Sequence, residues 1–67
     1  MRKWLKDLRE KNKLTQQDMA KKLSIAQQYY SCIEKGERQK DLNLSIVKKI
    51  SGIFGVSIEW IAEQEGK

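Results

Sequence analysis

The fold is decided by the stretch LTQQDMAKKLSIAQQYYSCIEKG, residues 14–36. Thr15 and Asp18 have the spacing of a capping box, in which each side chain bonds the backbone N–H of the other residue. This pair predicts a helix over Gln16–Leu23. Gly36 predicts the end of a second helix, because glycine readily adopts the left-handed conformation that follows many helices.

The second helix is predicted from about Ala26 to Lys35, with Ser24 and Ile25 in the turn. The apolar residues after this turn do not continue the stripe of the preceding helix in register, so one continuous helix is excluded. Two short helices joined in this way form a helix-turn-helix unit, here about residues 15–36. The second helix of such a unit can lie in the major groove of DNA.

A first helix is predicted over residues 2–11, where apolar residues recur at helical spacing among charged neighbours. These apolar residues are Met1, Trp4, Leu5 and Leu8. The helix is expected to stop near Asn12 and Lys13, and Asn12 tolerates a left-handed terminus.

Two further helices are predicted after a polar loop over residues 37–43. The fourth helix covers about 44–54, and its inward residues are Val47, Ile50, Ile53 and Phe54. Val56 and Ser57 supply a hydrophobic staple and a cap for a short fifth helix over 58–61. Residues 64–67 are expected to fray. The fold class is therefore all-α, with five helices in a single domain, residues 1–67.

The charge of the chain favours a polyanionic partner. The net charge is +5 with 14 basic and 9 acidic residues, and the basic excess belongs to residues 1–49. Such a charge suits nucleic acid or an anionic membrane, although a merely soluble basic surface has the same composition.

Several classes of function are disfavoured. The chain has one cysteine, Cys32, and no histidine, so it lacks an internal disulfide and the usual ligands and general base of metal and acid-base sites. We expect no metal, cofactor or small-molecule ligand, and no enzymatic activity. The sequence shows neither a membrane span nor a signal peptide, and it predicts a cytoplasmic protein.

The outer face of the helix after the turn is the candidate site. A helical wheel places Gln27, Gln28, Ser31, Cys32 and Lys35 on one side, which is polar and free of acid. Glutamine presents a donor and an acceptor on one planar amide, which matches the edge of adenine in the major groove. The alternative is that Gln27 and Gln28 are ordinary solvated helix residues.

Residues 14–38, together with GVSIEWI at 55–61, resemble the phage repressor and Cro-type helix-turn-helix family, also called the xenobiotic-response-element family. The resemblance covers about residues 4–61. It rests on Leu-Thr-Gln at the beginning of the helix-turn-helix unit, on Ala20 facing inward, on the residues from Ile33 to Arg38 at the end of the unit, and on Gly-Val-Ser near the end of the chain. It implies a compact lambda-repressor-like domain that binds double-stranded DNA.

The resemblance also implies roles for single residues. Gln27, Gln28 and Ser31 would read bases. The DNA backbone would be contacted by Gln16 at a helix N-terminus, by Tyr29 and by Arg38 and Lys40 of the loop, with Lys35 as a further candidate on the outer face. Tyr29 is equally compatible with partial burial, and the loop charges with simple solvation.

Arg9 and Glu34 match a structural ion pair of the family, and Ile58, Trp60 and Ile61 match positions of its core and subunit contact. Two departures concern the turn. Ser24 replaces a frequent glycine, and Ala26 replaces a frequent capping residue. Ser24 could also cap the second helix earlier, with Gln27 closing the box, which would remove Gln27 from base reading.

The leading hypothesis is a transcriptional regulator, a repressor that binds an operator as a homodimer with half-sites about one helical turn apart. An antitoxin that represses its own promoter is the alternative within the same class. A protein-interaction module that uses the same five helices is the alternative from another class.

Overall fold

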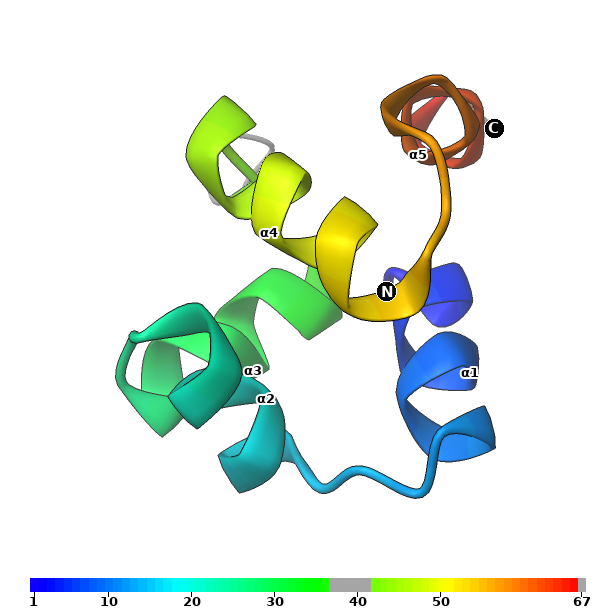
Figure 1. Cartoon of the computed structure of the whole chain (residues 1–67). Coiled ribbons are helices and arrows are strands. Elements are labelled where there is room, and N and C mark those ends of the chain that lie inside the picture. The colour runs from blue at the N-terminus through cyan, green and yellow to red at the C-terminus, as the bar shows by residue number, and fades with distance from the viewer. Residues whose placement is uncertain (37–41, 67) are drawn as a thin grey trace.

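The stretch 14–36 folds into two short helices, α2 (Gln16–Leu23) and α3 (Gln27–Lys35). This computed structural model describes residues 1–36 and 42–66. The helix α1 (Lys3–Lys11) precedes the pair, and α4 (Leu44–Phe54) and α5 (Ile58–Glu65) follow it. Strands are absent from the two described ranges, and the predicted all-α class is confirmed. Figure 1 shows α4 lying over α2 and α3, while α1 and α5 lie on the other side of the domain.

One core is shared by all five helices. Its central residue is Tyr30, which is fully buried and lies on the inner face of α3. The predicted inward residues of α2 are buried, and so is Ile50 of α4. Val47, Ile53 and Phe54 pack against the core but stay partly exposed, whereas Ile46 is buried without having been predicted. The buried hydrophobic residues are Leu5, Met19, Ala20, Leu23, Tyr30, Ile33, Ile46, Ile50 and Ile61.

The first helix, predicted over residues 2–11, is confirmed except for its first residue, because α1 covers Lys3–Lys11, and two details at its ends need correction. Met1 is 74% exposed and is not part of the apolar stripe. The left-handed residue after α1 is Lys13, with φ of 58°, whereas Asn12 has φ of −93°. The backbone N–H groups of Lys13 and Leu14 turn back to the carbonyls of Glu10 and Arg9, which is the Schellman pattern of helix termination.

The prediction for the last helix was too short. α5 does not end near Ile61 but continues to Glu65, so the predicted fraying is wrong for residues 64 and 65. The carboxylate of Glu65 bonds Arg2 and Trp4 at the start of the chain, and these contacts hold the last turn. The cap at the start of α5 is confirmed, because Ser57 accepts a hydrogen bond from the backbone N–H of Trp60 at 2.9 Å.

The turn between α2 and α3 is built on Ser24 in the left-handed conformation, with φ of 58° and ψ of 44°. The N–H of Ser24 donates to the carbonyl of Lys21, and the N–H of Ile25 donates to that of Ala20. These two bonds form a second Schellman motif, whose left-handed position favours glycine. Ser24 therefore carries the steric cost that a β-carbon brings in the left-handed conformation.

We expect Ser24→Gly to stabilise the domain by up to about 1 kcal/mol, because glycine adopts this conformation without the clash of a β-carbon. Urea unfolding followed by circular dichroism measures the change. Ser24→Ala is the control, since it retains the β-carbon and should bring no such gain. Equal stability of the glycine and alanine variants would contradict the expected relief of strain.

Candidate nucleic-acid interface

The two sides of α3 differ in burial as the helical wheel predicts. Tyr30, Ile33 and Glu34 are buried against the domain. The opposite side exposes Gln27, Gln28, Cys32 and Lys35, all with exposed side chains. Ser31 and Tyr29 are half-buried between these two groups, and Tyr29 packs against the core. The structure thus presents the glutamine pair and Lys35 outward, with Ser31 less accessible than the other predicted base-reading residues.

The start of α3 has no side-chain cap. Ala26 occupies the N-cap position with an extended backbone, and it makes no capping hydrogen bond. Ser24 ends α2 and does not begin α3. The alternative in which Ser24 caps the helix and Gln27 closes the box is therefore wrong, and Gln27 is free of that role at the first position of α3.

A polar cleft joins the starts of α2 and α3. Gln16 and Gln27 line the cleft, together with Lys13 at the end of α1. The cleft brings a predicted backbone-contacting residue next to a predicted base-reading residue. Sequence reasoning missed Lys13, because the only signal was its place beside Asn12 at a helix end. The predicted backbone contacts Arg38 and Lys40 lie outside the described residues.

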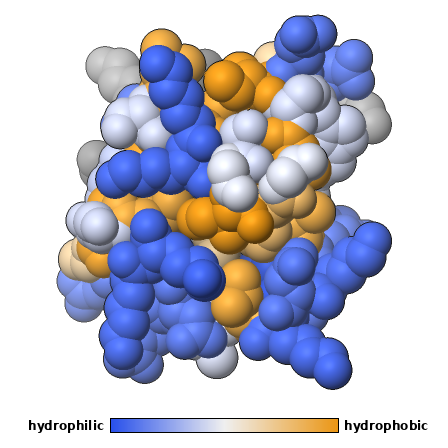
Figure 2. All heavy atoms as spheres, viewed as in Figure 1, coloured by the Kyte–Doolittle hydropathy of each residue, from blue (hydrophilic) through white to orange (hydrophobic). Residues whose placement is uncertain are grey.

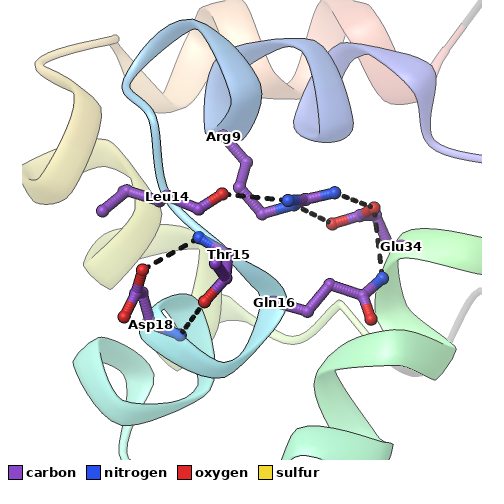
Figure 3. Close-up of polar contacts among 6 residues, drawn as sticks. All are labelled: Arg9, Leu14, Thr15, Gln16, Asp18 and Glu34. Carbon is purple, nitrogen blue, oxygen red and sulfur yellow. Dashed lines mark hydrogen bonds and ion pairs between the residues drawn. The ribbon is translucent and has the colours of Figure 1, made fainter.

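A buried polar network joins α3 and the segment before α2 to α1 (Figure 3). Arg9 donates from Nε to Oε2 of Glu34 at 2.9 Å and from Nη2 to Oε1 at 3.2 Å. Its remaining Nη1 donates to the carbonyl of Leu14 at 2.9 Å. The side chains of Arg9 and Glu34 are only 12% and 2% exposed. The arginine therefore fixes α3 and the segment before α2 with a single guanidinium group.

Gln16 takes part in the same network. Its Nε2 donates to Oε1 of Glu34 at 3.4 Å, so the amide is directed toward α3 (Figure 3). The preceding residue, Thr15, forms the predicted capping box with Asp18: Oγ1 of Thr15 accepts from the backbone N–H of Asp18 at 3.0 Å, and Oδ2 of Asp18 accepts from that of Thr15 at 2.9 Å. The capping box is confirmed, and it sets the point where α2 begins.

The network keeps Glu34 ionised. Burial alone raises the pKa of the Glu34 carboxyl, but the hydrogen bonds from Arg9 and Gln16, the charge of Arg9 and the nearby Tyr30 hydroxyl outweigh it and lower the pKa below its ordinary value. The hydrogen bond to Glu34 raises the pKa of Arg9. Burial, followed by the nearby Glu34 carboxylate, raises the pKa of Tyr30, which stays protonated.

The lowered pKa of Glu34 predicts a loss of stability in acid. A carboxyl whose pKa is lower in the folded than in the unfolded chain stabilises the fold above its unfolded pKa, about 4.3 for glutamate, and this contribution disappears as the pH falls through the folded pKa. We expect the free energy of unfolding to fall as the pH decreases below about 4.3. Urea titrations from neutral to acid pH measure this fall.

The Glu34→Gln variant should be less stable than the wild type at neutral pH. It should also lose less stability on acidification, because its side chain does not titrate. Glu63→Gln on α5 is the control, since Glu63 is exposed. Its pH profile should match that of the wild type. If the free energy of unfolding falls equally with decreasing pH in Glu34→Gln and in the wild type, Glu34 is not the group responsible for the loss of stability in acid.

The predicted subunit contacts are only partly on the surface. Ile61 is 1% exposed and lies in the core, so its assignment as a subunit contact does not fit the structure. Trp60 is half-buried against Trp4, with ring centroids 5.8 Å apart in an edge-to-face arrangement. Ile58 is 42% exposed. Of the three, Ile58 is the one with a largely accessible side chain.

Ile58 borders an apolar groove between α4 and α5. Leu44, which is 61% exposed, lies on the opposite side of this groove, with Leu42 and Val47 in its wall. On the face shown in Figure 2, hydrophilic side chains cover most of the lower part, and hydrophobic side chains lie across the middle and reach the upper part. The residues that line the groove belong to α4, α5 and the segment before α4, and none of them belongs to α3.

Two other properties of the described residues bear on function. No helix within them is long and apolar enough to cross a bilayer. They also contain no group of three or more cysteine, aspartate or glutamate residues arranged to hold a metal ion.

The comparisons with known proteins agree with this geometry. The model of the helix-turn-helix family matches residues 5–61. The uncharacterized HTH-type transcriptional regulator MJ0272 of Methanocaldococcus jannaschii is 44% identical over 59 residues, which cover 88% of this chain and 86% of the relative. No solved structure is significantly similar to this chain.

Two Bacillus subtilis relatives are similar at the same level. The uncharacterized HTH-type transcriptional regulator YqaE is 41% identical over 61 residues, which cover 91% of this chain but 51% of that protein. The uncharacterized HTH-type transcriptional regulator YqaF is 42% identical over 55 residues, or 82% of this chain and 70% of the relative. This chain thus spans about half the length of YqaE.

Proposed function

This chain belongs to the helix-turn-helix family of DNA-binding transcriptional regulators, of the phage-repressor and Cro type, and on that premise we propose that it is a repressor that reads an operator sequence as a homodimer. In this proposal α3 enters the major groove, and Gln27 and Gln28 read base edges. Each subunit contacts one half-site, with half-sites about one helical turn apart.

The observation that carries the proposal is the exposure of Gln27 and Gln28 at the start of a rigidly held α3. Both side chains are exposed, while the other side of α3 is buried and bound to α1 through Arg9 and Glu34. A planar amide held on a fixed helix can make the paired hydrogen bonds that distinguish adenine from other bases. Ser31, which is half-buried, is proposed as a third, weaker contact.

The backbone of the DNA is contacted, in this proposal, from both ends of α3. Gln16 and Lys13 line the same cleft as Gln27, and we assign them to phosphates beside the bases that Gln27 reads. Lys35 is exposed at the other end of α3. Tyr29, Arg38 and Lys40 complete the set inferred from the family. Such contacts add affinity without sequence preference.

The subunit contact is proposed on the face of α4 and α5. Ile58 and Leu44 expose apolar surface there, away from the glutamine pair. α5 carries three glutamates and no basic residue, which suits a surface that is turned away from DNA.

Selection of bound sites from a random DNA pool tests the proposal and gives the operator. On the best site, Gln28→Ala is expected to cost about 1–3 kcal/mol, or roughly 5- to 150-fold in affinity, and to relax the preference at one base pair. Gel shifts on the selected site and on single-base variants of it measure both effects.

Gln64→Ala is the matched control, because it removes the same amide from α5. Gln64 is half-buried beside Trp4 and Trp60, and the variant should keep the full binding profile. An unchanged profile for Gln28→Ala would remove Gln28 from the reading surface. A pool that yields no preferred sequence would refute the sequence-specific function itself.

A further inference from the structure

The C-terminal end of α3 is capped by Arg2. The last carbonyl groups of a helix have no partner within the helix. The backbone N–H of Arg2 donates to the carbonyl of Glu34 at 2.8 Å, and its Nη1 donates to the carbonyl of Ile33 at 2.6 Å. Arg2 also places a positive charge at the negative end of the α3 dipole. Arg2, the residue directly before α1, thus satisfies two carbonyls of α3.

The same guanidinium group binds the end of α5. Nε of Arg2 donates to Oε1 of Glu65 at 2.8 Å, and Nε1 of Trp4 donates to Oε2 of Glu65 at 2.9 Å. Arg2 is only 7% exposed, although it is charged. We call this group of Arg2, Trp4 and Glu65 the Arg2 junction. It joins the start of α1, the end of α3 and the end of α5.

The junction adds a polar anchor to the C-terminal end of α3, whose N-terminal half is held by packing against α2 and by buried Tyr30. The C-terminal half of α3 is held by two arginines, Arg2 at its end and Arg9 at Glu34. The N-terminal end begins at Ala26 without a side-chain cap. The glutamine pair lies at this end, so its tilt depends on the polar anchors at the other end together with the packing against α2.

The length of α3 amplifies small changes at the junction. Gln27 and Lys35 are the first and last residues of the 9-residue helix, which places them about 12 Å apart along the axis. A tilt of roughly 5° about the fixed end therefore moves Gln27 by about 1 Å. A paired hydrogen bond to a base edge requires side chains held to about 0.5 Å.

We propose that Arg2 and Glu65 are positioning residues for DNA reading, which set the tilt of α3 from α5 without contacting the DNA. The inference rests on the proposed function of α3. It also makes α5 the element through which a change at the subunit face reaches the glutamine pair, because Glu65 and Ile58 belong to the same helix. The carboxylate of Glu65 is the polar link from the end of α5 to Arg2, beside the packing of Ile61 in the core and of Trp60 on Trp4.

The test compares Glu65→Gln with Glu63→Gln in the full chain. Both variants remove one negative charge from α5, so their general electrostatic effect on DNA affinity is matched. Glu63 is exposed and its side chain lies outside the junction. Two quantities are measured: amide hydrogen exchange in α3 without DNA, and the ratio of affinity for the selected site to affinity for unrelated DNA.

We expect Glu65→Gln to speed exchange of the α3 amides by about 10-fold, because a charged hydrogen bond to its anchor is weakened. The affinity ratio should fall roughly 3- to 10-fold, the size of effect found for residues that act through others. Glu63→Gln should change neither quantity. Measurements are made well below the unfolding temperature of each variant, so that loss of folded protein does not enter the ratio.

Equal exchange and equal ratios in the two variants would overturn the inference. Faster exchange with an unchanged ratio would also overturn it, because the junction would then stabilise α3 without positioning its glutamines. A wild-type chain with no sequence preference would refute the proposed function and the role in reading together. The exchange data would then still show whether Arg2 and Glu65 hold α3.

Discussion

Arg9→Met is expected to lower the free energy of unfolding by about 3–5 kcal/mol, because it leaves the carboxylate of Glu34 buried without its partner. A domain of this size has a total stability of roughly 3–10 kcal/mol. The variant should therefore be close to unfolded at 25 °C. Urea unfolding by circular dichroism, or the thermal midpoint when no folded baseline remains, measures the loss.

The reason for so large an effect is the geometry of the pair. Glu34 is 1% exposed, and Arg9 reaches it with two nitrogens while its third bonds Leu14. Removal of the arginine therefore costs the ion pair, a backbone hydrogen bond and the packing of its stem. The double variant Arg9→Met/Glu34→Leu should recover most of the stability, since no unpaired charge is left.

Lys11→Met is the control for the charge itself. Lys11 lies in the last turn of α1 with an exposed side chain, and its replacement should change stability by no more than about 0.5 kcal/mol. A loss below about 1 kcal/mol for Arg9→Met would show that the pair behaves like an exposed surface ion pair.

The affinity for DNA is expected to fall roughly 10³- to 10⁴-fold when the salt concentration rises from 50 to 200 mM. In the proposed complex the cationic phosphate contacts are Lys35, Arg38 and Lys40, with Lys13 as a fourth, or about six to eight in a dimer, and each contributes about −0.9 to the slope of log affinity against log salt. Fluorescence anisotropy with a labelled operator at four or five salt concentrations measures the slope.

The Lys40→Ala variant should reduce that slope by about 2 per dimer and should weaken binding to all sequences alike. Lys3→Ala is the matched control. Lys3 is exposed at the start of α1, next to the residues that contact the end of α5, and its removal should leave the slope unchanged. A sequence-selective loss in Lys40→Ala would contradict a phosphate contact. Weak binding at every salt concentration would favour the protein-interaction module over the DNA reader.

The helix-turn-helix unit was predictable because its signals are local. The capping box of Thr15 and Asp18 spans four residues, and Gly36 acts on the residues directly before it. Each signal acts through backbone geometry within one or two turns of helix. A single sequence is therefore sufficient to predict the helix-turn-helix unit. The separation of α3 into a buried and an exposed side follows equally from helical periodicity.

The remaining features depend on contacts between distant parts of the chain. Arg2 and Glu65 are 63 residues apart, and nothing near either residue indicates that they meet. The same contact extends α5 beyond its predicted end. The left-handed residue at the end of α1 was misassigned by one position, because either Asn12 or Lys13 fits the local pattern. The hydrogen bond from the backbone N–H of Leu14 to the carbonyl of Arg9 makes Lys13 the left-handed residue.

The division of α3 into an inner and an outer side has an evolutionary consequence. Its inner residues, Tyr30, Ile33 and Glu34, are part of the interior on which the fold of this chain depends. The outward positions, Gln27, Gln28 and Lys35, lie outside that interior. Target preference can therefore diverge between duplicated copies by a few substitutions that leave folding untouched, and a synthetic variant could be redirected to a new promoter by the same route.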